Sequence, residues 1–293
     1  MKKNILTVSA IVLFSFAYST AQLPDTDIFL FKARTAGKKH SFGEAKNITN
    51  RVGYDNQPCF SPDSKELLFV SVEDSGQSEI WKYNITDKTK TRITDTEESE
   101  YSPTFIRGGE KISTVRVDKD GGQRFYILDY PMTNHSELVK NSDSIGYSCW
   151  VNDSLITMFV VEDTSSLQVL DLKTQQRTFV MTNPGRCMKI HPKNKELYFI
   201  DKNDSAHWYL STYNFKSKKI KKVIETLPGS EDFAFFSDGT LISGFKSGVF
   251  ELKGKSWVSI GKPIVSMEND FYRIAISPDD QYIAVVSFKG KKP

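Results

Sequence analysis

Short apolar segments alternate with polar turns along most of the chain. The stretch YDNQPCFSPDSKELLFVS at 54–71 is typical of a strand, a tight turn and a second strand, because Pro62 presets φ and Asp63 favours turn geometry. The stretch FYRIAISPDDQYIAVVS at 271–287 repeats it, with Pro278 and Asp279 in the turn. No helical pattern of comparable strength occurs, so the pattern predicts an all-β protein.

The hairpin recurs six times, each copy with a bulky residue before the turn, at intervals of 45, 45, 40, 45 and 41 residues. A period of about 40–45 residues with only strand signals is typical of a four-stranded propeller blade. Third strands such as EIWKYN and shorter, polar fourth strands such as TRIT follow the hairpins. The repeat predicts a six-bladed β-propeller in which the bulky residues pack between blades; they are Phe60, Phe105, Trp150, Ile190, Phe235 and Ile276.

The last copy of the repeat stops after two strands, at IAVVSFKG. Two further strand patterns, DIFLFKAR and AKNITN, stand near the other end of the chain and supply a third and a fourth strand. We therefore expect N-terminal strands to complete the last blade and close the ring, which leaves no unpaired inner edge. The predicted propeller is a single domain over residues 22–293.

Residues 1–21 have the pattern of a signal peptide: Lys2 and Lys3, a short apolar run, and small residues before Gln22. The apolar run has about 14 residues, short of the roughly 20 that span a membrane. The first cysteine is Cys59, so no lipobox cysteine is present. We expect a periplasmic or secreted protein with no membrane insertion after cleavage.

Charge and motifs narrow the function classes. The formal charge is +3, or +1 without Lys2 and Lys3, which gives no support for a nucleic-acid partner. The sequence has no G-x-S-x-G elbow, H-E-x-x-H motif, P-loop or dinucleotide fingerprint, so no cofactor is predicted. The segment DKDGGQ at 118–123 fits a hairpin turn better than a calcium loop, and FKSKKIKK at 215–222 fits a lysine-rich edge strand.

The histidines and cysteines suggest structural roles. We expect surface positions and no metal site for the four histidines, which belong to different blades: His40, His135, His191 and His207. Cys149 and Cys187 are predicted on neighbouring inner strands, and the sequence is compatible either with a disulfide between them or with two free thiols. Free thiols in a tight ring are the favoured interpretation.

The innermost strand of each blade lines the central channel, with alternate residues facing it. The position before each bulky residue is mostly small: Cys59, Thr104, Cys149, Lys189, Ala234 and Ala275. Two and four residues earlier, this alternation predicts a polar ring at the channel mouth, made of Asp55, Gln57, Glu100, Ser102, Tyr147, Asp232 and Arg273. Asp232 and Arg273 lie on adjacent blades and could pair. The ring predicts a ligand site, the alternative being a water-filled channel with incidental polar lining.

The Pro-Asp hairpin and the strand after it, YDNQPCFSPDSKELLFVS and SEIWKYN, resemble the repeat of TolB-like proteins, which are exported six-bladed propellers. The resemblance extends over residues 26–290 and is weakest in the second and third repeats, which read IRGG and VNDS at the turn. It implies the propeller fold and an extracytoplasmic location, and it implies a function only loosely.

The leading functional hypothesis is a non-catalytic binding or scaffolding module that holds a protein segment or an envelope glycan at the channel mouth. The alternative is a propeller-fold lyase, lactonase or glycosidase acting on a carbohydrate-like substrate, with Glu100 and Asp232 as acid and base. A third hypothesis, a structural subunit of an envelope assembly, predicts large apolar surface patches.

Overall fold

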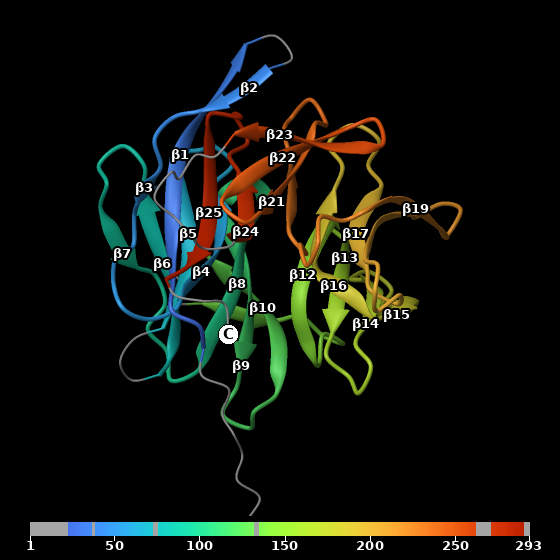
Figure 1. The fold of residues 1–293 in the computed structure, drawn as a ribbon. Helices are drawn as coiled ribbons and strands as arrows, with labels where there is room; N and C mark the ends of the chain where they lie inside the picture. The colour runs from blue at the N-terminus through green and yellow to red at the C-terminus, as the bar shows by residue number, and fades with distance from the viewer. Residues whose placement is uncertain (1–22, 37–38, 73–75, 132–134, 262–270, 290–293) are drawn as a thin grey trace, which may run out of the picture.

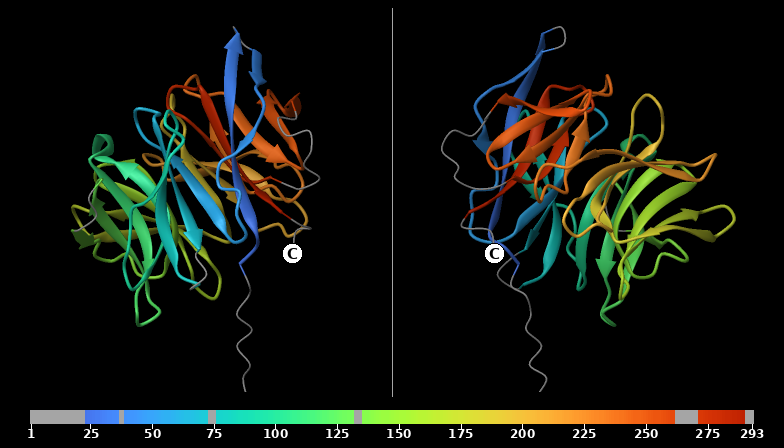
Figure 2. Two further views of the ribbon diagram at one scale, coloured as in Figure 1. Left: turned by 90° about the vertical axis from the view of Figure 1, so that its left-hand side faces the viewer. Right: turned by 45° about the vertical axis from the view of Figure 1, so that its right-hand side comes forward.

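The computed structural model describes residues 23–36, 39–72, 76–131, 135–261 and 271–289, so the predicted signal peptide lies outside the described residues. Six antiparallel sheets surround a common centre (Figures 1 and 2), which confirms the predicted six-bladed all-β propeller. A single 3-10 turn, η1 (Arg107–Gly109), is the helical element of the described part. No helix in the described ranges has the length and apolarity to cross a membrane.

In blades 1 to 5 the strands follow one another from the inner to the outer edge in chain order. Blade 1 consists of β4 (Asp55–Phe60), β5 (Glu66–Val72), β6 (Ser78–Asn84) and β7 (Lys90–Arg92), and blade 2 of β8 (Ser99–Ile106), β9 (Lys111–Val117), β10 (Gln123–Asp129) and β11 (Ser136–Leu138). Blade 3 consists of β12 (Ile145–Asn152), β13 (Leu155–Val160), β14 (Ser166–Asp171) and β15 (Gln176–Thr182), and blade 4 of β16 (Pro184–Ile190), β17 (Leu197–Asp201), β18 (Tyr209–Asn214) and β19 (Lys219–Glu225). Blade 5 consists of β20 (Phe233–Phe235), β21 (Leu241–Phe245), β22 (Gly248–Lys253) and β23 (Ser256–Gly261).

Blade 6 is closed by the N-terminal strands, as the sequence predicts. The inner strands β24 (Phe271–Ile276) and β25 (Tyr282–Phe288) are followed by β1 (Thr26–Ala36), which pairs with β25 from Thr26 to Lys32, and β3 (Lys46–Asn47) pairs with β1. The far end of β1 pairs with β2 (Lys39–Phe42), and this hairpin extends beyond the ring (Figure 1). The hairpin was not predicted, because its short polar sequence carries no repeat signal.

Six apolar clusters form the core, one at each boundary between neighbouring blades. Each cluster contains one of the six bulky residues, so their predicted packing between blades is confirmed. Phe60, for example, packs with Ile28 and Val286 across the boundary between blades 1 and 6. Strand β1 supplies Ile28 to this cluster and Phe31 to the one between blades 5 and 6, so it joins three blades.

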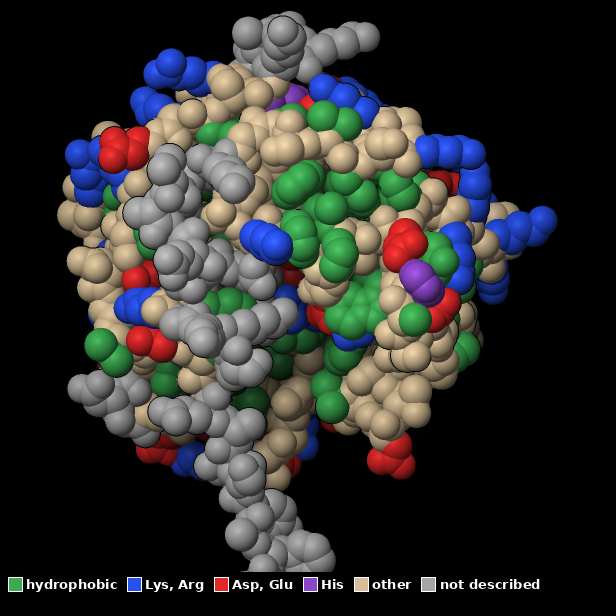
Figure 3. Space-filling view, viewed as in Figure 1, with side chains coloured by type: hydrophobic (Ala, Val, Ile, Leu, Met, Phe, Trp, Pro, Cys, Tyr) green, Lys and Arg blue, Asp and Glu red, His purple; other side chains and the backbone are tan. Residues whose placement is uncertain are grey.

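Several smaller predictions are confirmed. The segment at 118–123 is a hairpin turn in which the Gly121 N–H donates to the Asp118 carbonyl over 2.8 Å. The lysine-rich strand β19 is the outer edge of blade 4, and its basic side chains project at the right of Figure 3. All three cysteines are free thiols.

The histidines correct one expectation. His40 is 8% exposed, because its ring stacks on Phe236 with the centroids 3.9 Å apart, so the expected surface position is wrong for this residue. His191 is half-buried between Tyr198 and Phe235, and its Nδ1 accepts backbone hydrogen bonds within the blade 4 turn. His135 and His207 are exposed.

Candidate functional site

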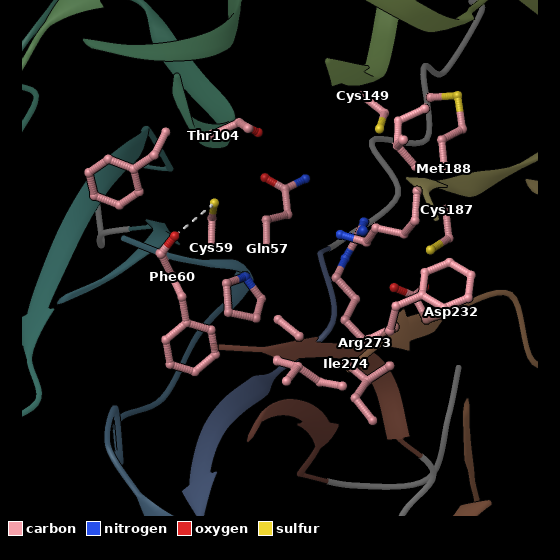
Figure 4. A pocket seen from close by; sticks show the side chains of 18 of the residues that line it. Gln57, Cys59, Phe60, Thr104, Cys149, Cys187, Met188, Asp232, Arg273 and Ile274 are labelled. Atoms are coloured by element: carbon pink, nitrogen blue, oxygen red, sulfur yellow. Dashed lines mark hydrogen bonds between the residues drawn. The ribbon is translucent and has the colours of Figure 1, made fainter. Parts of the chain in front are cut away.

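The inner strands of all six blades line a central cavity of about 600 Å³ (Figure 4). We call one end of the cavity the mouth; it lies at the N-terminal halves of the inner strands and is lined by Gln57, Ser102, Tyr147, Arg186, Asp232 and Arg273. The opposite end lies at the hairpin turns, where Ser237, Pro278 and Asp280 line it. The site is therefore built where the inner strands of the six blades converge.

Bulges at the mouth decide which side chains face the cavity. In β4 the register shifts between Asn56 and Cys59, and in β8 it shifts between Tyr101 and Thr104. Gln57 and Ser102 occupy these bulges with φ of 57° and 54°, in the left-handed region. The Ser102 N–H donates to Gln57 Oε1 over 2.6 Å and ties blade 2 to blade 1. A bulge inserts an extra residue and re-aims its neighbours, so strict alternation fails here.

Five of the seven predicted mouth residues line the cavity: Gln57, Ser102, Tyr147, Asp232 and Arg273. Asp55 and Glu100 do not line it, and both are fully buried. The bulges separate them from the channel-facing positions two residues later, which corrects the expectation that they face the channel. Asp55 forms an ion pair with Arg51 over 3.2 Å, and Glu100 forms one with Arg116 over 3.0 Å.

The two buried carboxyls have perturbed pKa values. Burial raises the pKa of Glu100 to about 7, although a 2.7 Å hydrogen bond from Thr96 and the charge of Arg116 lower it, and the neighbouring Glu79 raises it further. Burial also raises the pKa of Asp55, against hydrogen bonds from Ser71 and Arg51. Glu100 lies outside the cavity, so it does not form an acid and base pair there with Asp232.

Asp232 belongs to a charge cluster at the mouth. Arg186 Nη2 lies 3.1 Å from Asp232 Oδ2, and Arg186 Nη1 lies 3.3 Å from Glu231 Oε2. Lys202 also pairs with Glu231. Two cations and two carboxylates thus neutralise one another across blades 4 and 5. Strict alternation along β16 does not place Arg186 in the channel, but the register of this strand shifts between Pro184 and Met188.

Arg273 reaches across the mouth. Its guanidinium carbon lies 5.0 Å from the ring centroid of Tyr147, which comes from blade 3 on the opposite side of the ring. Guanidinium groups favour the face of an aromatic ring through its negative quadrupole. The contact places a positive charge over the cavity entrance, and Figure 4 shows the Arg273 side chain extending toward the centre.

Lys189 is the one lysine of the described chain in the cavity lining, and its side chain is exposed to the channel. Desolvation lowers the pKa of Lys189, but the nearby Asp232 carboxylate opposes this, and the pKa lies above its usual value. The ammonium is therefore charged at neutral pH. Three thiols lie near it, those of Cys59, Cys149 and Cys187, and burial raises the pKa of each, to about 12 for Cys187, so they are neutral.

The described residues contain no group of three or more His, Cys, Asp or Glu side chains placed to hold a metal ion. The polar groups that line the cavity are the Gln57 amide, hydroxyls, thiols and the charged side chains of blades 4, 5 and 6. Such a set can orient a ligand by hydrogen bonds and ion pairs.

Comparisons with known proteins agree with this geometry. No family model matches the sequence. An uncharacterised protein of Agrobacterium fabrum is 28% identical over 89 residues, which is 30% of this chain and 28% of the length of that protein. A solved structure assigned as TolB from Agrobacterium tumefaciens is similar with a TM-score of 0.69 at 13% identity, covering 92% of this chain and 99% of the other. In fold, the chain is a TolB-like six-bladed propeller.

Two other solved structures share the TolB-like propeller fold. One is an oligogalacturonate lyase in complex with manganese, with a TM-score of 0.55 at 11% identity, covering 85% of this chain and 82% of the lyase. The other is assigned as a gluconolactonase, with a TM-score of 0.61 at 10% identity, covering 90% of this chain and all of the other. At these identities the likeness concerns the fold, which hosts binding and catalytic proteins alike.

Proposed function

We propose that this TolB-like propeller is a non-catalytic binding module that holds a protein segment or an envelope glycan at the channel mouth. The observation that carries the proposal is the cavity of about 600 Å³, into which polar groups from six blades converge. Its volume lies within the roughly 300–1,000 Å³ of known ligand pockets. The predicted signal peptide and the TolB-like fold favour a periplasmic or extracellular site of action.

The mouth offers several kinds of contact on a rigid frame. The Gln57 amide points toward the centre of the cavity (Figure 4), and Tyr147 contributes an aromatic ring. The charged groups of Arg186, Asp232 and Arg273 border the same opening. Because their strands are fixed by the blade interfaces, these groups are organised before a ligand arrives, which reduces the entropy lost on binding.

The second candidate is an enzyme of the lyase, lactonase or glycosidase kind, which the fold of two similar proteins favours. Paired carboxylates for acid and base catalysis would have to face the cavity. Among the described lining residues the carboxylates are Asp232 and Asp280, at opposite ends. Asp232 pairs with Arg186, and Asp280 accepts a 2.6 Å hydrogen bond from Ser237 Oγ. These contacts favour the binding module.

The test is an affinity enrichment from native envelope extract with residues 22–293 as bait. The mouth variant carries Asp232→Ala and Arg273→Ala, and the control variant carries Glu137→Ala and Lys219→Ala on exposed outer strands. Thermal melting confirms that each variant folds. A ligand retained by wild type and control but lost by the mouth variant supports the proposal. Equal capture by all three baits contradicts it, as does turnover of a glycan or lactone that Asp232→Ala abolishes.

A further inference from the structure

Lys189 breaks the pattern of the narrow ring just below the mouth. The five equivalent positions carry uncharged, mostly small side chains: Cys59, Thr104, Cys149, Ala234 and Ala275. None of the residues that the structure describes forms a hydrogen bond or ion pair with the Lys189 ammonium. The Lys189 side chain is exposed to the channel, so its charged ammonium is accessible to a ligand that enters the cavity. A departure from a repeated pattern is expected at functional sites, which makes Lys189 a candidate ligand contact.

The charge of the cavity lining indicates what this ligand carries. Three cationic side chains, Arg186, Lys189 and Arg273, face two anionic ones, Asp232 and Asp280, so the described lining has a net charge of +1. Arg186 and Asp232 form an ion pair with each other. A carboxylate, with a charge of −1, balances the lining, whereas a phosphate monoester of −1.5 to −2 exceeds it. The lining therefore fits a monocarboxylate.

Uncharged polar groups lie beside this charge. The Gln57 amide and the Thr104 hydroxyl both point into the cavity in Figure 4, on blades adjacent to each other. An amide donates and accepts hydrogen bonds, as does a hydroxyl, so both suit the hydroxyl groups of a sugar. The Tyr147 ring adds a flat apolar surface on the next blade. Groups suited to a carboxylate and to sugar hydroxyls thus line one cavity.

We propose that the channel binds an acidic sugar unit, with its carboxylate on the Lys189 ammonium below the mouth and its hydroxyl groups on Gln57 and Thr104. The proposal rests on the binding function proposed above and specifies the ligand as an acidic glycan or its terminal unit. Arg273 provides a second positive charge at the entrance and attracts the anion as it enters.

Isothermal titration calorimetry with D-glucuronate and D-glucuronamide tests the proposal, because the two probes differ in one group, a charged carboxylate in the first and a neutral carboxamide in the second. Residues 22–293 are expected to bind glucuronate at least 10-fold more tightly than glucuronamide. Lys189→Met keeps an unbranched side chain that is one atom shorter and removes its charge. It should weaken glucuronate binding about 10- to 100-fold and glucuronamide binding less than 3-fold. Lys219→Met, on the exposed strand β19, is the matched control and should change neither affinity.

Other outcomes overturn the proposal. Equal affinity for the two probes means that the site does not distinguish a charged from a neutral group. A preference for glucuronate that persists in Lys189→Met places the carboxylate away from residue 189. Absence of binding to both probes at 10 mM contradicts an acidic sugar as the ligand. In each case the enrichment with the mouth variant still decides separately whether the channel is a binding site.

Discussion

The fully buried Glu100 makes a sharp prediction about stability and pH. Its carboxyl lies between blades 1 and 2, where burial raises its pKa from an ordinary 4.5 to about 7. Between these values the unfolded chain has lost the proton and the folded protein still holds it, so the stability of the fold decreases as the pH rises. Each unit of pKa corresponds to about 1.4 kcal/mol, which gives an unfavourable contribution of about 3 kcal/mol at pH 8.

Glu100→Gln replaces the carboxyl by a neutral group of the same shape that still accepts a hydrogen bond from Arg116. We expect the variant to exceed wild type in free energy of unfolding by about 1 kcal/mol at pH 5 and about 3 kcal/mol at pH 8. Urea denaturation at both pH values measures the difference. Glu137→Gln, at an exposed position of β11, controls for the loss of a negative charge. A variant that is less stable at pH 8, or a difference that does not change with pH, would refute the reasoning.

Three further predictions test closure, packing and burial. Deletion of residues 23–36 removes β1 from two blade interfaces. The cooperative unfolding transition measured by calorimetry should therefore be lost. An unchanged transition would show that the ring does not depend on β1. Gly185→Ala places a Cβ 2.7 Å from Ile200 Cβ and should lower the free energy of unfolding by about 1–3 kcal/mol in urea, and no loss would contradict this close packing. Cys187 is 5% exposed, and burial raises its pKa to about 12. Its thiol should therefore react with a disulfide reagent at pH 8 at least 100-fold more slowly in the folded protein than in urea. Equal rates would contradict its burial.

The sequence predicted the fold well because the propeller repeats its local signals. Each Pro-Asp or related turn marks one hairpin, and the spacing of the bulky residues gives the number of blades. Each bulky residue packs in a different interface cluster, because equivalent positions of a repeat meet equivalent neighbours. The hairpin of β1 and β2 escaped prediction, as did the burial of His40 against Phe236, since neither belongs to the repeat.

The sequence by itself determined the strand order, the blade number, the closure by N-terminal strands and five of the six residues that line the mouth. Only the tertiary structure decided that Asp55 and Glu100 turn away from the channel and that Arg186 turns toward it. The reason is physical: a bulge changes the facing of every residue on one side of it, and its position depends on contacts between blades, such as the bond from Ser102 to Gln57. The pairing of Arg186 with Asp232 likewise joins strands that are separated by 46 residues in the chain, and no local pattern encodes such a distance.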